Sequence, residues 1–174
     1  MTANPINDWE NPQISGINRE PAHASLLPYA DLPAALSGVR ERSPFFKLLN
    51  GFWKFHFAPN PELAPADFHL PSADVSGWEY LPVPSNWQIH GYGIPRYLAG
   101  GYAFAHDDPP RVQADTNETG SYRIPFTLPE SWQGRQVFLN FAGVDSAFYL
   151  WINGQQVGFS KDSRLPAEFN ITPY

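Results

Sequence analysis

The sequence predicts an all-β protein whose strands form a sandwich. Aromatic residues are abundant, with 6 Trp, 8 Tyr and 13 Phe in 174 residues, and aromatic side chains favour the pleated surface of a sheet. Turn-forming residues are also frequent, with 19 Pro and 13 Gly. Residues that usually fill helices are scarce, because the chain has 1 Met and 3 Lys. About seven short apolar segments with hairpin-like spacing favour a sandwich.

The first 50 residues are predicted to form an irregular N-terminal arm. Prolines interrupt this stretch repeatedly, and each one pushes the preceding residue away from helical geometry. One short helical turn is expected over Leu32–Leu36. Such an arm is ordered only when it packs on its own domain or on a neighbouring subunit. We therefore divide the chain into an arm, residues 1–50, and a sandwich domain, residues 51–174.

The strands of the sandwich are expected over 51–57, 78–81, 122–128, 137–141, 147–152, 155–159 and 168–171. The first of these places aromatic side chains at every second position, which is the period of a strand. Pro125 indicates an edge or irregular position within the third. Asn153-Gly154 is the strongest two-residue hairpin signal and should join the fifth and sixth strands.

Residues 82–120 form a long segment without sustained periodicity. Loops of this length inside a compact domain are usually functional or disordered. Its aromatic residues include Trp87, Tyr92, Tyr97 and Tyr102, and they need burial or a partner. They could stack on the apolar face of a sugar ring, although anchoring of the loop itself is the commoner role of such residues.

Composition and charge exclude several classes of function. The formal net charge is −6 and the basic residues are scattered, so no positive stripe is available for nucleic acid. No apolar run reaches the length of a membrane span, and the first residues lack the pattern of a signal peptide. The chain also contains no Cys. These features predict a cytoplasmic protein without a disulfide framework.

Few residues have the spacing that metal binding, nucleophilic catalysis or phosphate binding requires. The five histidines show no metal-ligand spacing, and there is neither a Gly-x-Ser-x-Gly motif nor a phosphate-binding glycine loop. Asp107 and Asp108 are adjacent, so on a strand they would point to opposite faces, and a solvated acidic turn is the simpler interpretation. Asp162 follows an aromatic hairpin. Its carboxylate could accept hydrogen bonds from sugar hydroxyls, or it could pair with Arg164 or cap a turn.

Three segments resemble the N-terminal domain of the large bacterial β-galactosidases of glycoside hydrolase family 2. The segments are Asp8-Trp9-Glu10-Asn11-Pro12 followed by Ile17-Asn18-Arg19; Leu49-Asn50-Gly51-Phe52-Trp53-Lys54-Phe55 with Val83-Pro84-Ser85-Asn86-Trp87-Gln88-Ile89-His90-Gly91-Tyr92; and Val144-Asp145-Ser146-Ala147-Phe148-Tyr149-Leu150-Trp151-Ile152-Asn153-Gly154 with Asp162-Ser163-Arg164-Leu165-Pro166-Ala167-Glu168-Phe169. The resemblance extends from about residue 8 to the end of the chain. It implies a jelly-roll β-sandwich of the galactose-binding-domain type, called the sugar-binding domain.

The resemblance also implies what the chain lacks. The catalytic glutamates and the Mg²⁺ ligands of the family lie in a barrel domain further along the polypeptide. Family members also continue past the position of Phe169 into further strands of the same sandwich. We therefore expect the 174-residue chain to be truncated within its sandwich, to be inactive alone, and to act together with the remaining domains of the same polypeptide.

The site residues that the resemblance implies are few. Asp162 matches an aspartate that contacts galactose hydroxyls and helps to ligate Na⁺. Ala99 occupies the position of a sugar-binding Asn, but its methyl group cannot make the hydrogen bond of an Asn side chain. Asp107 could supply this lost polar contact, although it is a weaker candidate than Asp162. Asp8 and Asn11 match positions near a peripheral cation, although capping of a turn is the favoured role.

The function that these expectations describe is hydrolysis of terminal non-reducing β-D-galactose, as in lactose, with retention by a cytoplasmic homo-oligomer. A related family 2 β-glucuronidase or β-mannosidase is one alternative, because Ala99 weakens the preference for the galactosidase branch. A stand-alone carbohydrate-binding or assembly module without catalysis is another, because fold does not fix function.

Overall fold

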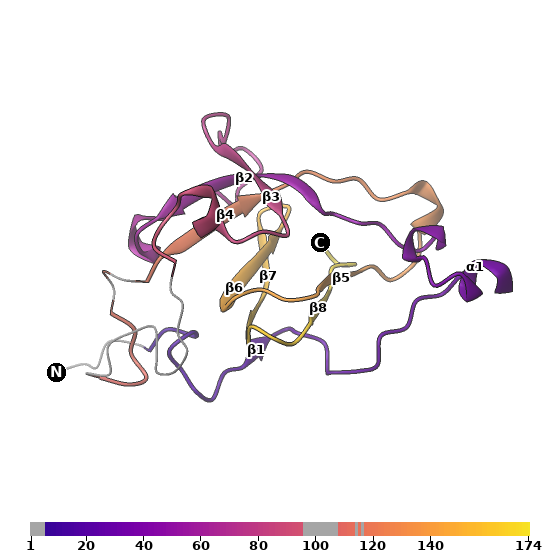
Figure 1. Cartoon of the computed structure of the whole chain (residues 1–174), viewed down its shortest axis with the longest axis horizontal. Coiled ribbons are helices and arrows are strands. Elements are labelled where there is room, and N and C mark those ends of the chain that lie inside the picture. The colour runs from indigo at the N-terminus through magenta and orange to yellow at the C-terminus, as the bar shows by residue number, and fades with distance from the viewer. Residues whose placement is uncertain (1–5, 96–107, 114, 116) are drawn as a thin grey trace.

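The computed structural model of the chain describes residues 6–95, 108–113, 115 and 117–174. Its strands are β1 (Gly16–Ile17), β2 (Gly51–Ala58), β3 (Glu79–Val83), β4 (Thr119–Arg123), β5 (Phe138–Phe141), β6 (Ala147–Ile152), β7 (Gln155–Lys161) and β8 (Ala167–Asn170). They pair as three antiparallel sheets, in the orders β1-β7-β6, β3-β2-β4 and β5-β8 (Figure 1). The predicted all-β class is confirmed, and the stacked antiparallel sheets are consistent with a β-sandwich.

The hairpin β6–β7 carries the segment that matters most for the site. Asn153 has φ of 51° and Gly154 has φ of 85°, and two consecutive positive φ angles are the signature of a type I′ turn. The two strands pair from Ile152 with Gln155 to Ala147 with Lys161. The predicted hairpin is therefore confirmed, and its far end brings the start of β6 beside the end of β7.

The sheet β3-β2-β4 packs its inner face around aromatic residues. Phe55, at the centre of β2, is 1% exposed. Its ring lies 4.8 Å from that of Tyr122, 5.0 Å from Tyr92 and 6.1 Å from Trp87, measured between centroids. Two of the aromatic residues of the long segment 82–120 therefore pack on the sheet. Pro82 lies in β3, an edge strand, where a missing N–H costs no ladder hydrogen bond.

The strand predicted over 122–128 is displaced, because β4 spans Thr119–Arg123. Pro125 has no N–H to donate, and the ladder with β2 ends where Arg123 pairs with Lys54. Phe126 instead packs against the core beside β5 and β8. Within β4, Gly120 lets the rings of Trp87 and Phe55 approach the backbone, because a Cβ there would lie 2.6 Å from Trp87 and 2.8 Å from Phe55.

The main hydrophobic core lies between β7, β6 and the β5-β8 sheet. Its buried members are Val137, Leu150, Val157, Ala167, Phe169 and Ile171. Phe169 is 0% exposed. A Cβ on Gly158 would collide with the carbonyl oxygen of Ile17 and with the ring of Phe169. The glycine in β7 thus allows both β1 and the core to approach the strand that leads to Asp162.

The arm runs beneath the β6-β7 and β5-β8 sheets to α1 (Leu32–Leu36), and the chain then returns as β2 (Figure 1). Strand β1 pairs with β7 at Ser160 and Phe159. Arg19 reinforces this contact, because its guanidinium donates to the hydroxyl of Ser160 at 3.0 Å. Two residues are too few to show periodicity, so β1 could not be predicted from the sequence.

The short helix α1 forms as predicted, and its stability is local. The carboxylate of Asp31 accepts a hydrogen bond of 2.8 Å from the Ala34 N–H, which is an N-cap, and Pro33 suits the first turn. Leu32 and Leu36 are 69% and 78% exposed. Short 3-10 turns also lie at Arg40–Arg42, Pro61–Leu63, Trp87–His90 and Glu130–Trp132.

A histidine fastens the arm to β8. The Nε2 atom of His23 lies 2.9 Å from Glu168 Oε1, and Nδ1 lies 2.9 Å from the carbonyl oxygen of Ala24. Because both ring nitrogens face acceptors, the geometry suits the doubly protonated ring. The Ala24 carbonyl, then the hydrogen bond and charge of Glu168, and more weakly the charge of Glu20, raise the pKa of His23 above 6.5. The Glu20 N–H also donates to the Glu168 carbonyl at 2.8 Å.

This contact predicts that the arm loosens at alkaline pH. A raised pKa in the folded state means that the stabilisation is fully present below about pH 6.5 and disappears as pH rises through the folded pKa. Hydrogen exchange of residues 20–26 in the full-length protein, corrected for the intrinsic rate, should increase between about pH 6 and about pH 8.5. His23→Gln should abolish this dependence, whereas His90→Gln, at an exposed histidine outside the arm, should retain it. Equal pH dependence in both variants would contradict the assignment.

Candidate functional site

Asp162 lies immediately after β7, in an exposed turn at the end of the hairpin. Its φ of 111° lies in a region that L residues with a Cβ rarely adopt. The backbone N–H donates to the Ser146 carbonyl at 3.2 Å, and Oδ1 accepts from the Arg164 N–H at 3.0 Å. The residue is thus held at the backbone and at one carboxylate oxygen.

The second carboxylate oxygen of Asp162 is available for a ligand. Within the described part of the chain, Oδ2 has no hydrogen-bond partner and the carboxylate makes no ion pair with the guanidinium of Arg164. Of the structural roles considered for Asp162, the turn cap is therefore the one observed. It uses one oxygen and leaves the other exposed to solvent.

The turn that contains Asp8 and Asn11 lies against the same end of β7. The Tyr149 hydroxyl donates to Asp8 Oδ2 at 2.6 Å, and burial together with this carboxylate raises the pKa of Tyr149. Lys161 Nζ donates to the carbonyl oxygens of Asn11 at 2.6 Å and of Asp8 at 3.4 Å. Asn11 Oδ1 accepts from the Gln13 N–H at 3.0 Å. The structure thus brings the predicted residues Asp8 and Asn11 next to the strand end that precedes Asp162.

These contacts favour the capping role for Asn11. The Lys161 ammonium already occupies the carbonyl oxygens of the turn, and its positive charge repels another cation nearby. Among the residues that the structure describes, no group of three or more His, Cys, Asp or Glu side chains is arranged to hold a metal ion. Among these four residue types, Asp162 therefore belongs to no larger ligand group in the described part of the chain, and a cation there would need ligands from other groups.

Two predicted site residues, Ala99 and Asp107, lie outside the described residues. The neighbouring Asp108 is exposed, and its Oδ2 lies 3.4 Å from Nε of Arg111. Its carbonyl oxygen accepts a hydrogen bond of 2.8 Å from the Arg111 N–H. Asp108 thus belongs to a solvated turn.

Sequence reasoning missed the structural role of Glu10, which is 9% exposed. Its carboxylate accepts hydrogen bonds from the Val112 N–H at 2.9 Å and from the Asn7 side chain at 3.0 Å. Burial opposes ionisation, but these bonds and the charge of Arg111 prevail and lower the pKa of Glu10. The position of Glu10 in the Asp-Trp-Glu-Asn-Pro segment could have indicated that it has a structural role. Nothing in that segment indicated Val112 as its hydrogen-bond partner.

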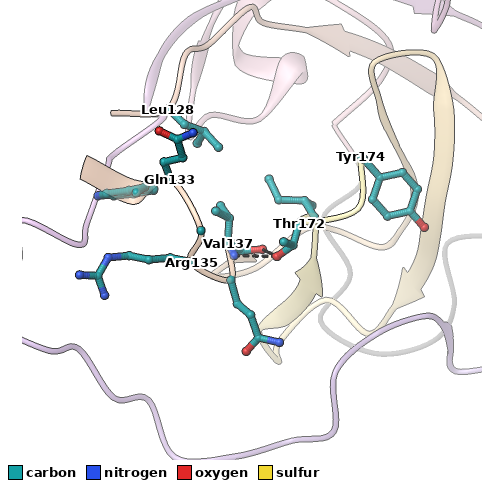
Figure 2. Close-up of a pocket in the computed structure, with 10 residues that line it drawn as sticks. Leu128, Gln133, Arg135, Val137, Thr172 and Tyr174 are labelled. Carbon is teal, nitrogen blue, oxygen red and sulfur yellow. Dashed lines mark hydrogen bonds between the residues drawn. The ribbon is translucent and has the colours of Figure 1, made fainter. Parts of the chain in front are cut away.

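A pocket of about 420 Å³ lies near the end of the chain (Figure 2), and Asp162 is not among the residues that line it. It is lined by Leu128, Trp132, Gln133, Gly134, Arg135, Gln136, Val137, Ile171, Thr172 and Tyr174. The Val137 N–H donates to Thr172 Oγ1 across its floor at 2.8 Å. None of these ten residues is an acid, so the pocket lacks the paired carboxylates that glycoside hydrolysis needs.

The antiparallel sheets, with Asp162 in an exposed turn after β7, describe an all-β domain that is consistent with a β-sandwich. Residues 46–174 match the family described as glycosyl hydrolases family 2, sugar binding domain. The chain belongs to this family, and the sequence-based identification is confirmed.

Several relatives are similar over nearly the whole chain. The β-galactosidase of Yersinia enterocolitica is 48% identical over 96% of this chain, that of Psychromonas ingrahamii 46% over 95%, and that of Priestia megaterium 41% over 99%. The matched regions are 15%, 16% and 17% of the respective relatives. This chain therefore spans about one sixth of the length of these relatives.

A solved structure has a similar fold. The crystal structure of a β-glycosidase from Bacteroides vulgatus superposes with a TM-score of 0.50 and 25% sequence identity, covering 72% of this chain and 15% of that one. Separately, the described residues include no helix that is long and apolar enough to cross a membrane.

Proposed function

We propose that this chain is the N-terminal sugar-binding part of a β-galactosidase that hydrolyses terminal non-reducing β-D-galactose residues with retention. The observation that carries the proposal is the similarity to proteins named β-galactosidase, at 41–48% identity over at least 95% of the chain. Retaining hydrolysis uses two carboxyl groups on either side of the scissile bond. In this proposal both are glutamates of a barrel domain that also holds Mg²⁺, so the chain itself binds and orients.

The role of Asp162 in this proposal is to present a carboxylate at the entrance of the active site. Its Oδ2 atom accepts a hydrogen bond from a sugar hydroxyl and contributes one oxygen ligand to Na⁺, a hard cation for which carboxylate oxygen is suitable. Bound Na⁺ supplies positive charge that holds the sugar hydroxyl oxygens. The support for this role is the position of Asp162 in the Asp-Ser-Arg-Leu-Pro motif and the free oxygen in its exposed turn.

The proposal includes a cytoplasmic homo-oligomer. The sequence contains no Cys, which agrees with a reducing compartment. The arm exposes Leu26, Leu32 and Leu36, which are 89%, 69% and 78% accessible in this chain alone. Such side chains are suited to burial against another subunit or another domain of the same polypeptide.

The alternative activities are those of a related family 2 β-glucuronidase or β-mannosidase. The similarity to a protein named only β-glycosidase allows this broader class, and Ala99 weakens the preference for galactose because a methyl side chain cannot hydrogen-bond a sugar hydroxyl. A stand-alone carbohydrate-binding module without catalysis is the remaining alternative.

The test begins with the intact denatured mass of the natural protein. The proposal expects a mass several-fold above 19.6 kDa, and preferential hydrolysis of β-galactosides in a panel that includes β-glucuronides and β-mannosides. A mass near 19.6 kDa would overturn the enzyme assignment and favour the binding module. A large protein that prefers another sugar would overturn the galactoside specificity alone.

A further inference from the structure

The turn that carries Asp162 needs external support. Its φ of 111° is an uncommon value for an L residue, and such conformations persist only when neighbouring contacts over-determine them. The hydrogen bond from Arg164 N–H to Asp162 Oδ1 also sets the direction of the carboxylate. Ser163 lies between Asp162 and Arg164, so the conformation of its backbone sets whether this hydrogen bond can form. Through that bond, Ser163 influences the direction of Oδ2.

Ser163 is tied to the opposite turn by a side-chain hydrogen bond. Its hydroxyl donates to Asp145 Oδ1 at 2.6 Å, across 18 residues of sequence. The adjacent bond from Asp162 N–H to the Ser146 carbonyl joins the same two turns at 3.2 Å. The end of the hairpin brings them together, because Ala147 pairs with Lys161 in the last register position of β6 and β7.

We propose that Asp145 is a positioning residue, which acts through the hydroxyl of Ser163 to hold Asp162 in the conformation that presents Oδ2 to the sugar and the cation. The inference rests on the function proposed above for Asp162. Asp145 itself does not touch the ligand in this scheme. Loss of such an outer contact typically weakens cation affinity or activity by about 10- to 100-fold.

The test compares variants of the full-length protein by Na⁺-dependent binding as well as by kinetics. Asp145→Ala and Ser163→Ala should raise the Na⁺ concentration for half-maximal activity and the KM for β-galactosides by about tenfold, with a smaller change in kcat. They should also reduce the Na⁺-dependent rise in Tm and the calorimetric affinity for a non-hydrolysable thiogalactoside. Asp145→Asn and Ser163→Thr keep an acceptor and a hydroxyl, and should restore values near the wild type.

A matched control separates this effect from general damage to a turn. Asp74 lies in another exposed turn and accepts the Ser76 N–H at 2.8 Å, so Asp74→Ala should leave the Na⁺ response unchanged. If Asp145→Ala does not fold, Ser163→Ala decides, because it removes one hydroxyl. Ordinary Na⁺ response and thiogalactoside affinity in a folded Ser163→Ala protein would overturn the inference.

The variant Asp162→Ala separates failure of the positioning role of Asp145 from failure of the proposed role of Asp162. If Asp162→Ala is impaired while Ser163→Ala and Asp145→Ala match the wild type, the positioning inference fails and the proposed function stands. If Asp162→Ala itself binds sugar and Na⁺ like the wild type, the proposed role of Asp162 fails. The double variant Asp145→Ala/Asp162→Ala should be no worse than Asp162→Ala, since the first residue acts through the second.

Discussion

Replacement of Asp162 by alanine in the full-length protein is expected to lower kcat/KM for β-galactosides by about 30- to 1,000-fold. A hydrogen bond to a charged group contributes about 1.5–3 kcal/mol, so the loss of one or two such contacts amounts to about 2–4 kcal/mol. The effect should be large if the proposed role holds, because only Oδ1 is engaged within the described part of the chain and Oδ2 is left for the sugar and the cation. Steady-state kinetics over a range of Na⁺ concentrations provides the measurement.

Two variants control for this result. Asp162→Asn retains the turn cap but removes the charge, so it should bind sugar better than alanine and respond less to Na⁺ than the wild type. Asp74→Ala, in a comparable exposed turn, should retain wild-type kinetics. Unchanged kcat/KM in a folded Asp162→Ala protein would show that this carboxylate does not contact the substrate.

Local signals in the sequence predicted much of the fold. Asn153-Gly154 identified its hairpin because a type I′ turn needs positive φ at both residues, and both have it. The short helical turn expected over Leu32–Leu36 forms as α1, and Asp31 caps its first turn. The strand expected over 122–128 was displaced because apolar alternation reports which side chains are buried, and Phe126 is packed outside the ladder.

Contacts between distant segments could not be predicted from the sequence. Asp162 was identified from its motif, but its support by Asp145 depends on the register that brings the two ends of the hairpin together. The attachment of His23 to Glu168 spans 145 residues and likewise leaves no periodic trace. The fold class follows from composition and short patterns, whereas the geometry of the site follows from tertiary pairing.

Phe169→Ala is expected to destabilise the sandwich by about 3–5 kcal/mol, the usual cost of removing a buried Phe side chain. Phe169 is 0% exposed, and its ring lies 6.0 Å from Phe148 and 6.2 Å from Phe141 in edge-to-face contacts. Gly158 leaves room for this ring directly beneath β7. The cavity left by alanine would therefore open against the strand that leads to Asp162, and the site should be weakened together with the core.

Hydrogen exchange of the full-length protein measures the destabilisation caused by Phe169→Ala at the level of single strands. Amides of residues 155–161 should lose protection in Phe169→Ala, and the apparent Na⁺ affinity should fall with them, because β7 positions the Asp162 turn. Phe52→Ala is the matched control: Phe52 lies in β2 and is 70% exposed, so its removal should change stability by less than about 0.5 kcal/mol. Equal protection of 155–161 in the two variants would show that the ring of Phe169 does not support β7.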